Sequence, residues 1–329
     1  MVTNRKLDSP EALLKIVKQV QEDYTEPPPH CQRGRPRTFS GRAFLLLAVV
    51  AVVLGTFKPQ ELPTLLATEE SLRQWLGCSR GPHRRTMARR LDATLSEAQA
   101  QVHALGHQSL GDGEPGPEEP QAAALAGRMD HAQGPLWPKR DRHQGRVPVG
   151  VRTVDTESAW AKSGYRGGGQ GSRVVLQGLV FPAPVPLFAR GCPNSVGEST
   201  GLEAALAADH LPLTELLLGD STVGGTARVA PYAQHGGWRL TPPQWPATPD
   251  SWQRALYAYR RATLELLFQR LLPASDLKIC PPKGLARTGT FVLASVWLYP
   301  GLCLDNPRHH RPVAHIKEII DEARWRIAA

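Results

Sequence analysis

The hydrophobic pattern of the chain changes near residue 147, and this change constrains the fold more than any other feature of the sequence. Before it, apolar residues recur at helical spacing in short segments separated by Gly and Pro. After it, three consecutive apolar runs have the length and composition of β-strands, at residues 147–154, 172–181 and 185–190. The sequence therefore predicts a helical first part followed by a domain built on a sheet.

Beyond the third run, helices and strands are expected to alternate. Helices are predicted at residues 199–210, 226–234, 252–272 and 316–327, strands at 213–218 and 238–240, and a helical or extended segment at 288–299. Three consecutive strands followed by alternating units predict an α/β domain with a mixed sheet flanked by helices. This order is similar to that of an RNase H-like domain. A Gly-rich stretch at residues 167–171 is expected to be a flexible hairpin tip between two strands.

The first 110 residues are expected to form only helices, arranged like a helix-turn-helix. The apolar run at 43–54 follows Ser40, a favoured N-cap, and precedes Gly55, a favoured helix end. Further helices are predicted within residues 1–30, at 59–67 and 69–76, and from 80 towards 105. A turn-rich acidic segment at 111–120 marks a boundary. The predicted organisation is a helical domain at 1–110, a linker at 111–146 that includes a short helix at 121–130, and the sheet domain at 147–329.

The charge of the chain favours a polyanionic partner, nucleic acid before membrane. The formal net charge is +9 and the sequence pI is about 9.6. The longest apolar run, residues 43–54, is too short to cross a bilayer, and the first residues do not have the pattern of a signal peptide. No two of the five cysteines form a Cys-x-x-Cys pair, which predicts a reduced chain without a zinc site. We therefore expect a protein of the cytoplasm, associated with the nucleoid and not with a membrane.

Two basic segments in the first part are predicted to contact double-stranded DNA. The first surrounds an Arg-Gly-Arg-Pro sequence, an element that fits A·T minor grooves, and its candidates are Arg33, Arg35 and Arg37. The second starts a helix after Pro82, in the position of a recognition helix, and its candidates are Arg84, Arg85, Arg89 and Arg90. The alternative for the first is a solvated linker, and for the second a solvated basic helix.

Three acids at the ends or faces of apolar segments are candidate metal ligands. Asp155 ends the first predicted strand, Asp220 follows a Leu-Leu-Leu-Gly run, and Glu265 lies on the long helix four residues after Arg261. Carboxylates brought together in this way suit Mg²⁺, which prefers oxygen ligands. Glu157 is an alternative to Asp155, because it lies on the same side of a strand. The structural alternatives are a turn-capping role for Asp155, an N-cap role for Asp220, and a simple ion pair between Glu265 and Arg261.

These residues resemble the DDE transposases of bacterial insertion sequences. The resemblance is carried by Val154-Asp155-Thr156, by Leu217-Leu218-Gly219-Asp220, and by the helix with Tyr257, Arg261, Glu265 and Leu267-Phe268. The Arg-Gly-Arg-Pro-Arg-Thr-Phe-Ser segment before an apolar helix is also similar to the start of many such transposases.

The resemblance implies a helical DNA-binding region followed by an RNase H-like catalytic domain. Asp155, Asp220 and Glu265 would bind two Mg²⁺ (or Mn²⁺) ions and act in phosphodiester hydrolysis and strand transfer at the ends of an insertion sequence. Arg261 would hold Glu265 or a DNA phosphate, and Tyr257 would face the DNA. The partners implied are the element ends and the target DNA, bound by a homodimer.

The sequence departs from the family pattern at two places. Leu272 stands where a basic residue is usual, seven positions after the Glu, and Ser221-Thr222-Val223 follows the second Asp where Gly and Tyr are common. The Tyr and Arg before Glu265 are also one residue out of the usual spacing, unless Arg260 takes the part of Arg261. A second hypothesis therefore stays open, in which the chain binds DNA but its RNase H-like domain is inactive.

Overall fold

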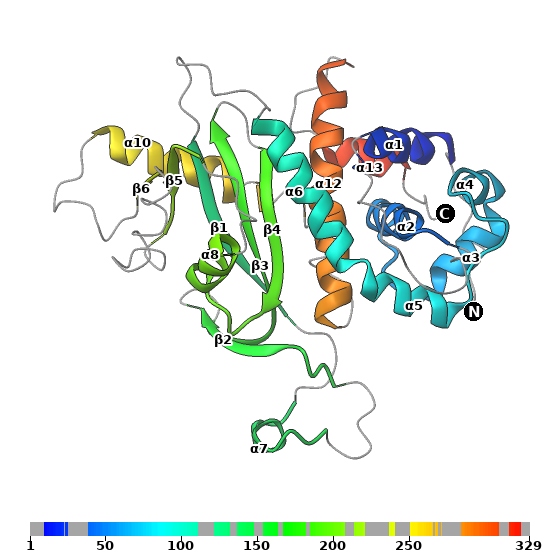
Figure 1. Ribbon diagram of the computed structural model, residues 1–329, viewed down its shortest axis with the longest axis horizontal. Coiled ribbons are helices and arrows are strands. Elements are labelled where there is room, and N and C mark those ends of the chain that lie inside the picture. The colour runs from blue at the N-terminus through cyan, green and yellow to red at the C-terminus, as the bar shows by residue number, and fades with distance from the viewer. Residues whose placement is uncertain are drawn as a thin grey trace. The chain divides into compact units, whose positions relative to one another are not determined.

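The computed structural model divides the chain into two compact units (Figure 1). The residues it describes are 10–22, 24–25, 39–110, 122–131, 137–147, 154–163, 167–181, 185–207, 214–220, 237–240, 251–265, 267–268, 271, 284–308 and 316–323. One unit, here called the helical unit, spans Met1–Gln101, Arg270–Pro282 and Thr290–Ala329, and the other, the sheet unit, spans Val102–Gln269 and Lys283–Gly289. This division differs from the predicted one, because the last part of the chain belongs with the helices of the first part.

The helical unit is built around one fully apolar helix. Its helices are α1 (Pro10–Glu22), α2 (Gly41–Leu54), α3 (Glu61–Thr68), α4 (Glu70–Trp75), α5 (Arg84–Ala93), the first part of α6 (Leu95–Leu110), α12 (Leu285–Arg308) from Thr290 on, and α13 (Ile316–Ala323). Every α2 residue from Ala43 to Leu54 is buried, and α1, α5 and α13 contact this helix. A helix that is apolar all round requires such burial on every side.

Both ends of α2 are those that the sequence predicts. The Ser40 hydroxyl accepts a hydrogen bond from the Ala43 N–H at 3.1 Å, which satisfies a backbone donor of the first turn. Gly55 closes the helix with φ 64°, a left-handed conformation that glycine adopts without steric cost. The rings of Phe57 and Phe291 then pack edge to face with their centres 5.3 Å apart, which holds α12 against the segment after α2.

The sheet unit contains a mixed sheet. Its strands are β1 (Ala122–His131), β2 (Ala159–Ser163), β3 (Gly167–Phe181), β4 (Val185–Pro193), β5 (Leu216–Leu218) and β6 (Trp238–Leu240). The order is β2-β3-β1-β5-β6, and β4 pairs with β3 beyond the end of β2. β3 is antiparallel to β1, β2 and β4, whereas β5 is parallel to both β1 and β6. The predicted α/β class with a mixed sheet flanked by helices is therefore confirmed.

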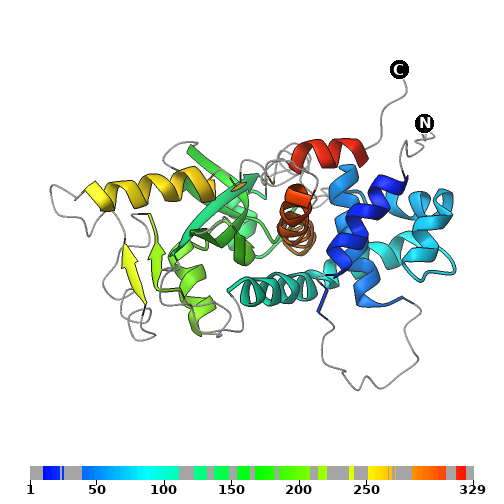
Figure 2. The same cartoon turned by 90° about the horizontal axis from the view of Figure 1, so that it is seen from above.

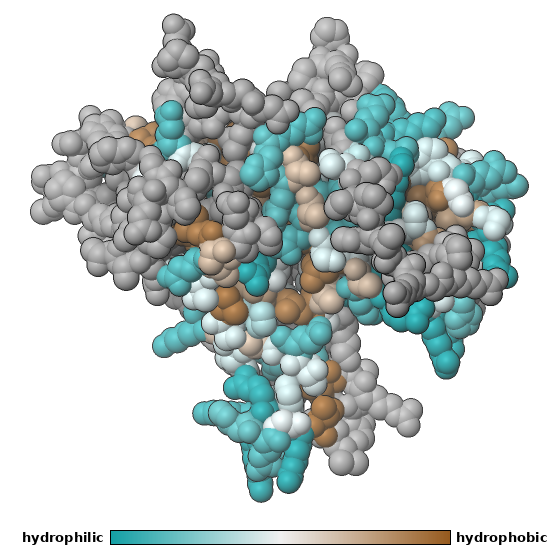
Figure 3. Space-filling model, in the orientation of Figure 1, coloured by the Kyte–Doolittle hydropathy of each residue, from teal (hydrophilic) through white to brown (hydrophobic). Residues whose placement is uncertain are grey.

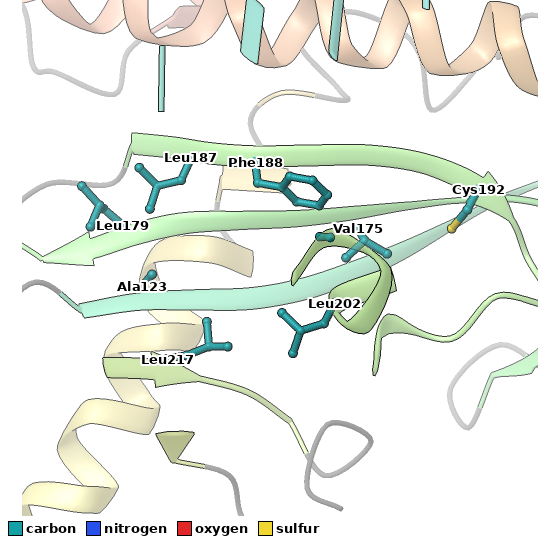
Figure 4. Packing of buried hydrophobic residues seen from close by; sticks show 9 residues of the cluster. Ala123, Val175, Leu179, Leu187, Phe188, Cys192, Leu202 and Leu217 are labelled. Atoms are coloured by element: carbon teal, nitrogen blue, oxygen red, sulfur yellow. The ribbon is translucent and has the colours of Figure 1, made fainter. Parts of the chain in front are cut away.

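Helices cover both faces of this sheet. They are α8 (Glu198–Ala207), the second part of α6, α10 (Ser251–Arg260) and the π-helical turn η3 (Arg261–Glu265). The short helix α7 (Lys139–His143) also belongs to this unit but lies apart from the sheet in Figure 1, and none of its residues is buried. α8 closes a core that includes Leu202 from the helix and Ala123, Val175 and Leu217 from three strands (Figure 4). On the other face Leu264 of η3 lies against Gly178 of β3, and Figure 2 shows α8 and α10 on opposite sides of the sheet.

Two predictions about this unit are wrong. Residues 122–131 form strand β1 rather than a short helix, because they pair along almost their whole length with β3 and three of them pair with β5. The alanines that favour a helix in isolation leave room for α8 at the centre of the sheet, so tertiary packing overrides propensity. The Gly-rich stretch at 167–171 is likewise the first part of β3 and pairs with β2, instead of forming a hairpin tip.

The other predicted strands and helices are either confirmed or lie outside the described residues. The predicted strands at 172–181, 185–190, 213–218 and 238–240 match β3, β4, β5 and β6. The long helix predicted from 252 begins as α10, but it passes into η3 after Arg260. Most of the strand predicted at 147–154 and the whole helix predicted at 226–234 lie outside the described residues. Within the part of the chain that is described, no helix is long and apolar enough to span a bilayer.

Candidate functional site

Asp220 lies beside the centre of the sheet. It follows β5, in which Leu217 and Leu218 are fully buried, and its own side chain is partly buried. β5 runs parallel to β1 with Leu218 opposite Ala124. Asp220 is two residues further along the chain, which brings it close to Gly127 of β1. This places a carboxylate next to the ends of two parallel strands.

Glu198 is an acid of this region that sequence reasoning missed. It is the first residue of α8, and its carboxyl group lies against Gly127, where any Cβ would collide with Glu198 Cγ and Oε1. The Gly127 N–H donates a hydrogen bond to this carboxylate. Glu198 Oε2 is fully buried and has no hydrogen-bond partner. The position has no signature of its own in the sequence, since it depends on how α8 packs on β1.

Burial and neighbouring charges set the protonation of Glu198. Removal from water, with the nearby Asp220 carboxylate as a second cause, raises the pKa of Glu198 from 4.5 to about 7, although Arg173, Arg260 and the Gly127 N–H act in the opposite direction. Arg260 is only 4% exposed, and its guanidinium group lies 5.5 Å from the centre of the Tyr257 ring. The cluster of Glu198, Asp220, Arg173 and Arg260, here called the acid–arginine cluster, therefore combines charges from four elements.

Asp155 has a different environment, at the N-terminus of α12. Its Oδ1 accepts hydrogen bonds from the N–H groups of Glu157 and Ser158 at 3.1 and 3.2 Å, and its Oδ2 accepts one from Gly284 at 3.3 Å. Glu157 Oε2 accepts a further bond from the Leu285 N–H at 2.7 Å. Both acids thus bind free backbone donors at the start of α12, where negative charge also complements the helix dipole.

The sheet topology separates Asp155 from Asp220. The Ser158 hydroxyl accepts a hydrogen bond from Gln170 of β3 at 2.7 Å, which holds the Asp155 turn next to β2. β3 and β1 lie between β2 and β5 in the sheet. The structure therefore does not bring these two predicted ligands together, and the turn-capping alternative describes the contacts of Asp155.

Replacing Asp155 by alanine is expected to destabilise the protein by about 2 kcal/mol even in the absence of metal, because three backbone donors lose their acceptor. The measurement is urea denaturation with EDTA present. Glu157→Gln is the matched control and should cost less, because Glu157 is exposed and accepts one hydrogen bond. An Asp155→Ala protein as stable as wild type would contradict the capping role.

The remaining residues of the predicted site lie on the helix that crosses the other face of the sheet. Tyr257 is partly buried on α10, and Arg261 is exposed at the start of η3. Glu265 is the last residue of η3, and its side chain lies outside the described residues. The α-helical spacing that would align Arg261 with Glu265 does not hold in a π-helical turn, where hydrogen bonds join residues five apart. Arg260, a buried member of the acid–arginine cluster, is the arginine of this helix that lies close to the sheet.

The described residues do not complete a three-acid metal centre. No group of three or more His, Cys, Asp or Glu side chains among them is arranged to hold a metal ion. Two carboxylates, those of Asp220 and Glu198, do fit a divalent cation in chemistry, because Glu198 Oε2 is buried without a hydrogen-bond partner. The η3 turn that carries Glu265 contacts β1, the strand next to both of these acids, and also β3.

The predicted basic contacts are partly visible on α5. Arg84, Arg85 and Arg89 are exposed, whereas Arg90 packs its guanidinium group over the Phe44 ring at 5.0 Å. Arg33, Arg35 and Arg37 lie outside the described residues.

The sheet unit has a second basic surface around α7, where Lys139, Arg140 and Arg146 are exposed, and Figure 3 shows hydrophilic residues gathered there. The Trp137 indole N–H donates to the Arg146 carbonyl at 2.9 Å and closes this segment into a loop.

Comparisons with known proteins give a structural likeness. No family model matches the chain, and no curated protein matches it. Among solved structures, a piggyBac transposase chain from a cryo-EM structure of its synaptic complex with hairpin DNA matches 96% of this chain over 77% of its own length. The sequence identity is 10% and the TM-score is 0.44, so this likeness carries no argument about the activity. The chain is thus similar in structure to a transposase at a level that leaves its family open.

Proposed function

We propose that the chain is a DNA transposase, which hydrolyses a phosphodiester at the ends of an insertion sequence and joins the freed 3′-hydroxyl to target DNA. The observation that carries this proposal is the sheet order β4-β3-β1-β5-β6, with β3 antiparallel and with Asp220 directly after β5. An RNase H-like domain would have this strand order, with an acid after this strand beside the central strand.

Asp220 and Glu265 are the proposed ligands of Mg²⁺ or Mn²⁺ in this reaction. When bound, such an ion would activate water and neutralise charge on the phosphodiester. The surroundings supply positive charge, because Arg173 and Arg260 lie next to the acids. Asp155 is less suited to the ligand role, since backbone N–H groups already occupy both of its oxygens. Joining two DNA ends requires two such centres, so a homodimer on DNA is part of the proposal.

A second candidate function is a DNA-binding protein with an inactive catalytic domain. The hydrogen bonding of Asp155 favours it, because one predicted ligand is used for another purpose. Leu272, which stands in place of a basic residue, favours it as well.

A nicking assay separates the two functions. Wild-type protein should nick supercoiled DNA that carries the element ends in Mn²⁺ and not in EDTA, and Asp220→Ala with Glu265→Ala should abolish this nicking, because the ion loses both proposed ligands. Glu215→Ala, which removes an exposed acid next to β5, should leave the nicking rate within about twofold because surface substitutions have small effects. Metal-dependent nicking that survives the double substitution would refute the transposase proposal. Tight DNA binding without any nicking by wild type would favour the second candidate.

The α5 arginines are tested through binding rather than cleavage. Replacing Arg84, Arg85 and Arg89 by glutamine should weaken binding to double-stranded DNA about tenfold or more at low salt and reduce the salt dependence of the affinity, since fewer counterions are released. The control removes three exposed charges elsewhere in the helical unit, through Lys18→Gln, Lys58→Gln and Lys317→Gln. Equal losses in both triple variants, measured by fluorescence anisotropy, would show a general charge effect and no recognition by α5.

A further inference from the structure

We propose that Glu198, in place of Asp155, joins Asp220 in binding the divalent cation of the catalytic centre. This inference rests on the proposed function, and it assigns a metal ligand on α8 that the sequence pattern does not indicate. It is carried by the register of the sheet, by the packing at Gly127 and by the unsatisfied oxygen of Glu198.

The register of the sheet brings the two acids to one place. Leu218 of β5 lies opposite Ala124 of β1, and the two strands run in the same direction. Asp220 therefore approaches the part of β1 around Gly127, three residues beyond Ala124. The Glu198 carboxyl group lies against that same glycine. Asp220 is therefore placed by the end of β5 within the sheet, and Glu198 is placed by α8, which packs on the sheet.

The Glu198 carboxyl group fits against β1 because Gly127 has no side chain. A Cβ at this position would overlap with Glu198 Cγ, Cδ and Oε1, so any other residue would displace the carboxyl group. The Gly127 N–H also donates a hydrogen bond to it. β1 is the central strand of the order β3-β1-β5, and at this point α8 supplies a carboxylate to the space above it.

The charged side chains around Glu198 leave one of its carboxylate oxygens without a hydrogen bond. Arg173 precedes Val175 by two residues on β3, and Val175 packs against Gly201 of α8, so Arg173 lies on the same face as this helix. Even so, Glu198 Oε2 accepts no hydrogen bond and Arg173 Nε donates none, although both atoms are buried. A buried carboxylate oxygen without a partner is costly, and a cation held with Asp220 would satisfy it.

The direct test is Mn²⁺ binding by the full chain, followed by electron paramagnetic resonance of the free ion. Glu198→Gln should weaken Mn²⁺ binding about tenfold or more, and Asp220→Asn should weaken it similarly, because each removes one charged ligand. Asp155→Asn and Glu203→Gln, the latter an exposed acid on α8, should leave the affinity within about twofold. Gly127→Ala keeps the carboxylate but displaces it, and it should weaken Mn²⁺ binding as well.

The outcomes distinguish this inference from the function on which it rests. Should Glu198→Gln bind Mn²⁺ and nick DNA like wild type while Asp220→Asn does neither, Glu198 is not a ligand but the transposase proposal stands. Should wild type neither bind Mn²⁺ nor nick DNA, both are overturned. Loss of Mn²⁺ affinity in Asp155→Asn but not in Glu198→Gln would restore the ligand set expected from the sequence. Circular dichroism of each variant verifies that the fold is intact, and glutamine at 198 matches the size of the residue it replaces.

Discussion

Between pH 5 and pH 8 the sheet unit should lose roughly 3 kcal/mol of stability because of Glu198 alone, and Glu198→Gln should remove most of this loss. Burial, with the Asp220 charge as a second cause, raises the pKa of Glu198 from 4.5 to about 7 in the folded chain. Between these values the folded state holds a proton that the unfolded state has released. Raising the pH through this window therefore favours unfolding, and the loss levels off once the pH is well above the folded pKa of about 7.

Hydrogen exchange in EDTA measures this effect where it occurs. Peptides of β1 and β3 report the opening free energy of the sheet unit once the intrinsic pH dependence of exchange is subtracted. The control is Glu203→Gln on the exposed side of α8, which should keep the wild-type pH dependence. At pH 8 the Glu198→Gln protein should be more stable than wild type. A pH profile unchanged by Glu198→Gln would mean that this carboxyl group is solvated and not buried against Gly127.

Gly106→Ala should destabilise the sheet unit by about 3 kcal/mol, although alanine is the better residue for a helix. Gly106 lies in α6 where the helix contacts β4, and a Cβ there would overlap with the backbone carbonyl of Leu187. Backbone atoms of a paired strand cannot rotate away as a side chain can. Three residues earlier on this side of α6, His103 stacks on Phe188 with ring centres 4.8 Å apart, so the helix has no room to withdraw.

The matched control for Gly106→Ala is the helical glycine of α8. A Cβ at Gly201 would meet only the side chain of Val175, at 3.2 Å, which needs a shift of a few tenths of an ångström. Gly201→Ala should therefore change the stability by less than about 1 kcal/mol. Thermal and urea denaturation of both variants measure the contrast. If Gly106→Ala instead stabilised the protein, as it does at an exposed helical glycine, the packing of α6 on β4 would be refuted.

Local signals in the sequence predicted the elements whose boundaries depend on neighbouring residues. Ser40 and Gly55 bound α2 because a hydroxyl and a left-handed glycine satisfy the ends of a helix without help from the rest of the chain. β3, β4, β5 and β6 were also predicted, because runs of apolar and β-branched residues favour extended chain. β1 was not predicted, since its alanines have helical propensity and only pairing with β3 and β5 makes it a strand.

The candidate site shows the same division. The sequence by itself determined that Asp220 follows a buried strand, because three leucines and a glycine before an acid describe a strand end. It could not determine that Asp155 caps α12 through Gly284, a residue 129 positions away, or that Gly127 leaves space for Glu198. Those facts depend on which segments pack together. A strand end or a helix cap depends on neighbouring residues and can be predicted from the sequence. The partners of a buried carboxylate depend on which distant elements pack together, so only the tertiary structure decides them.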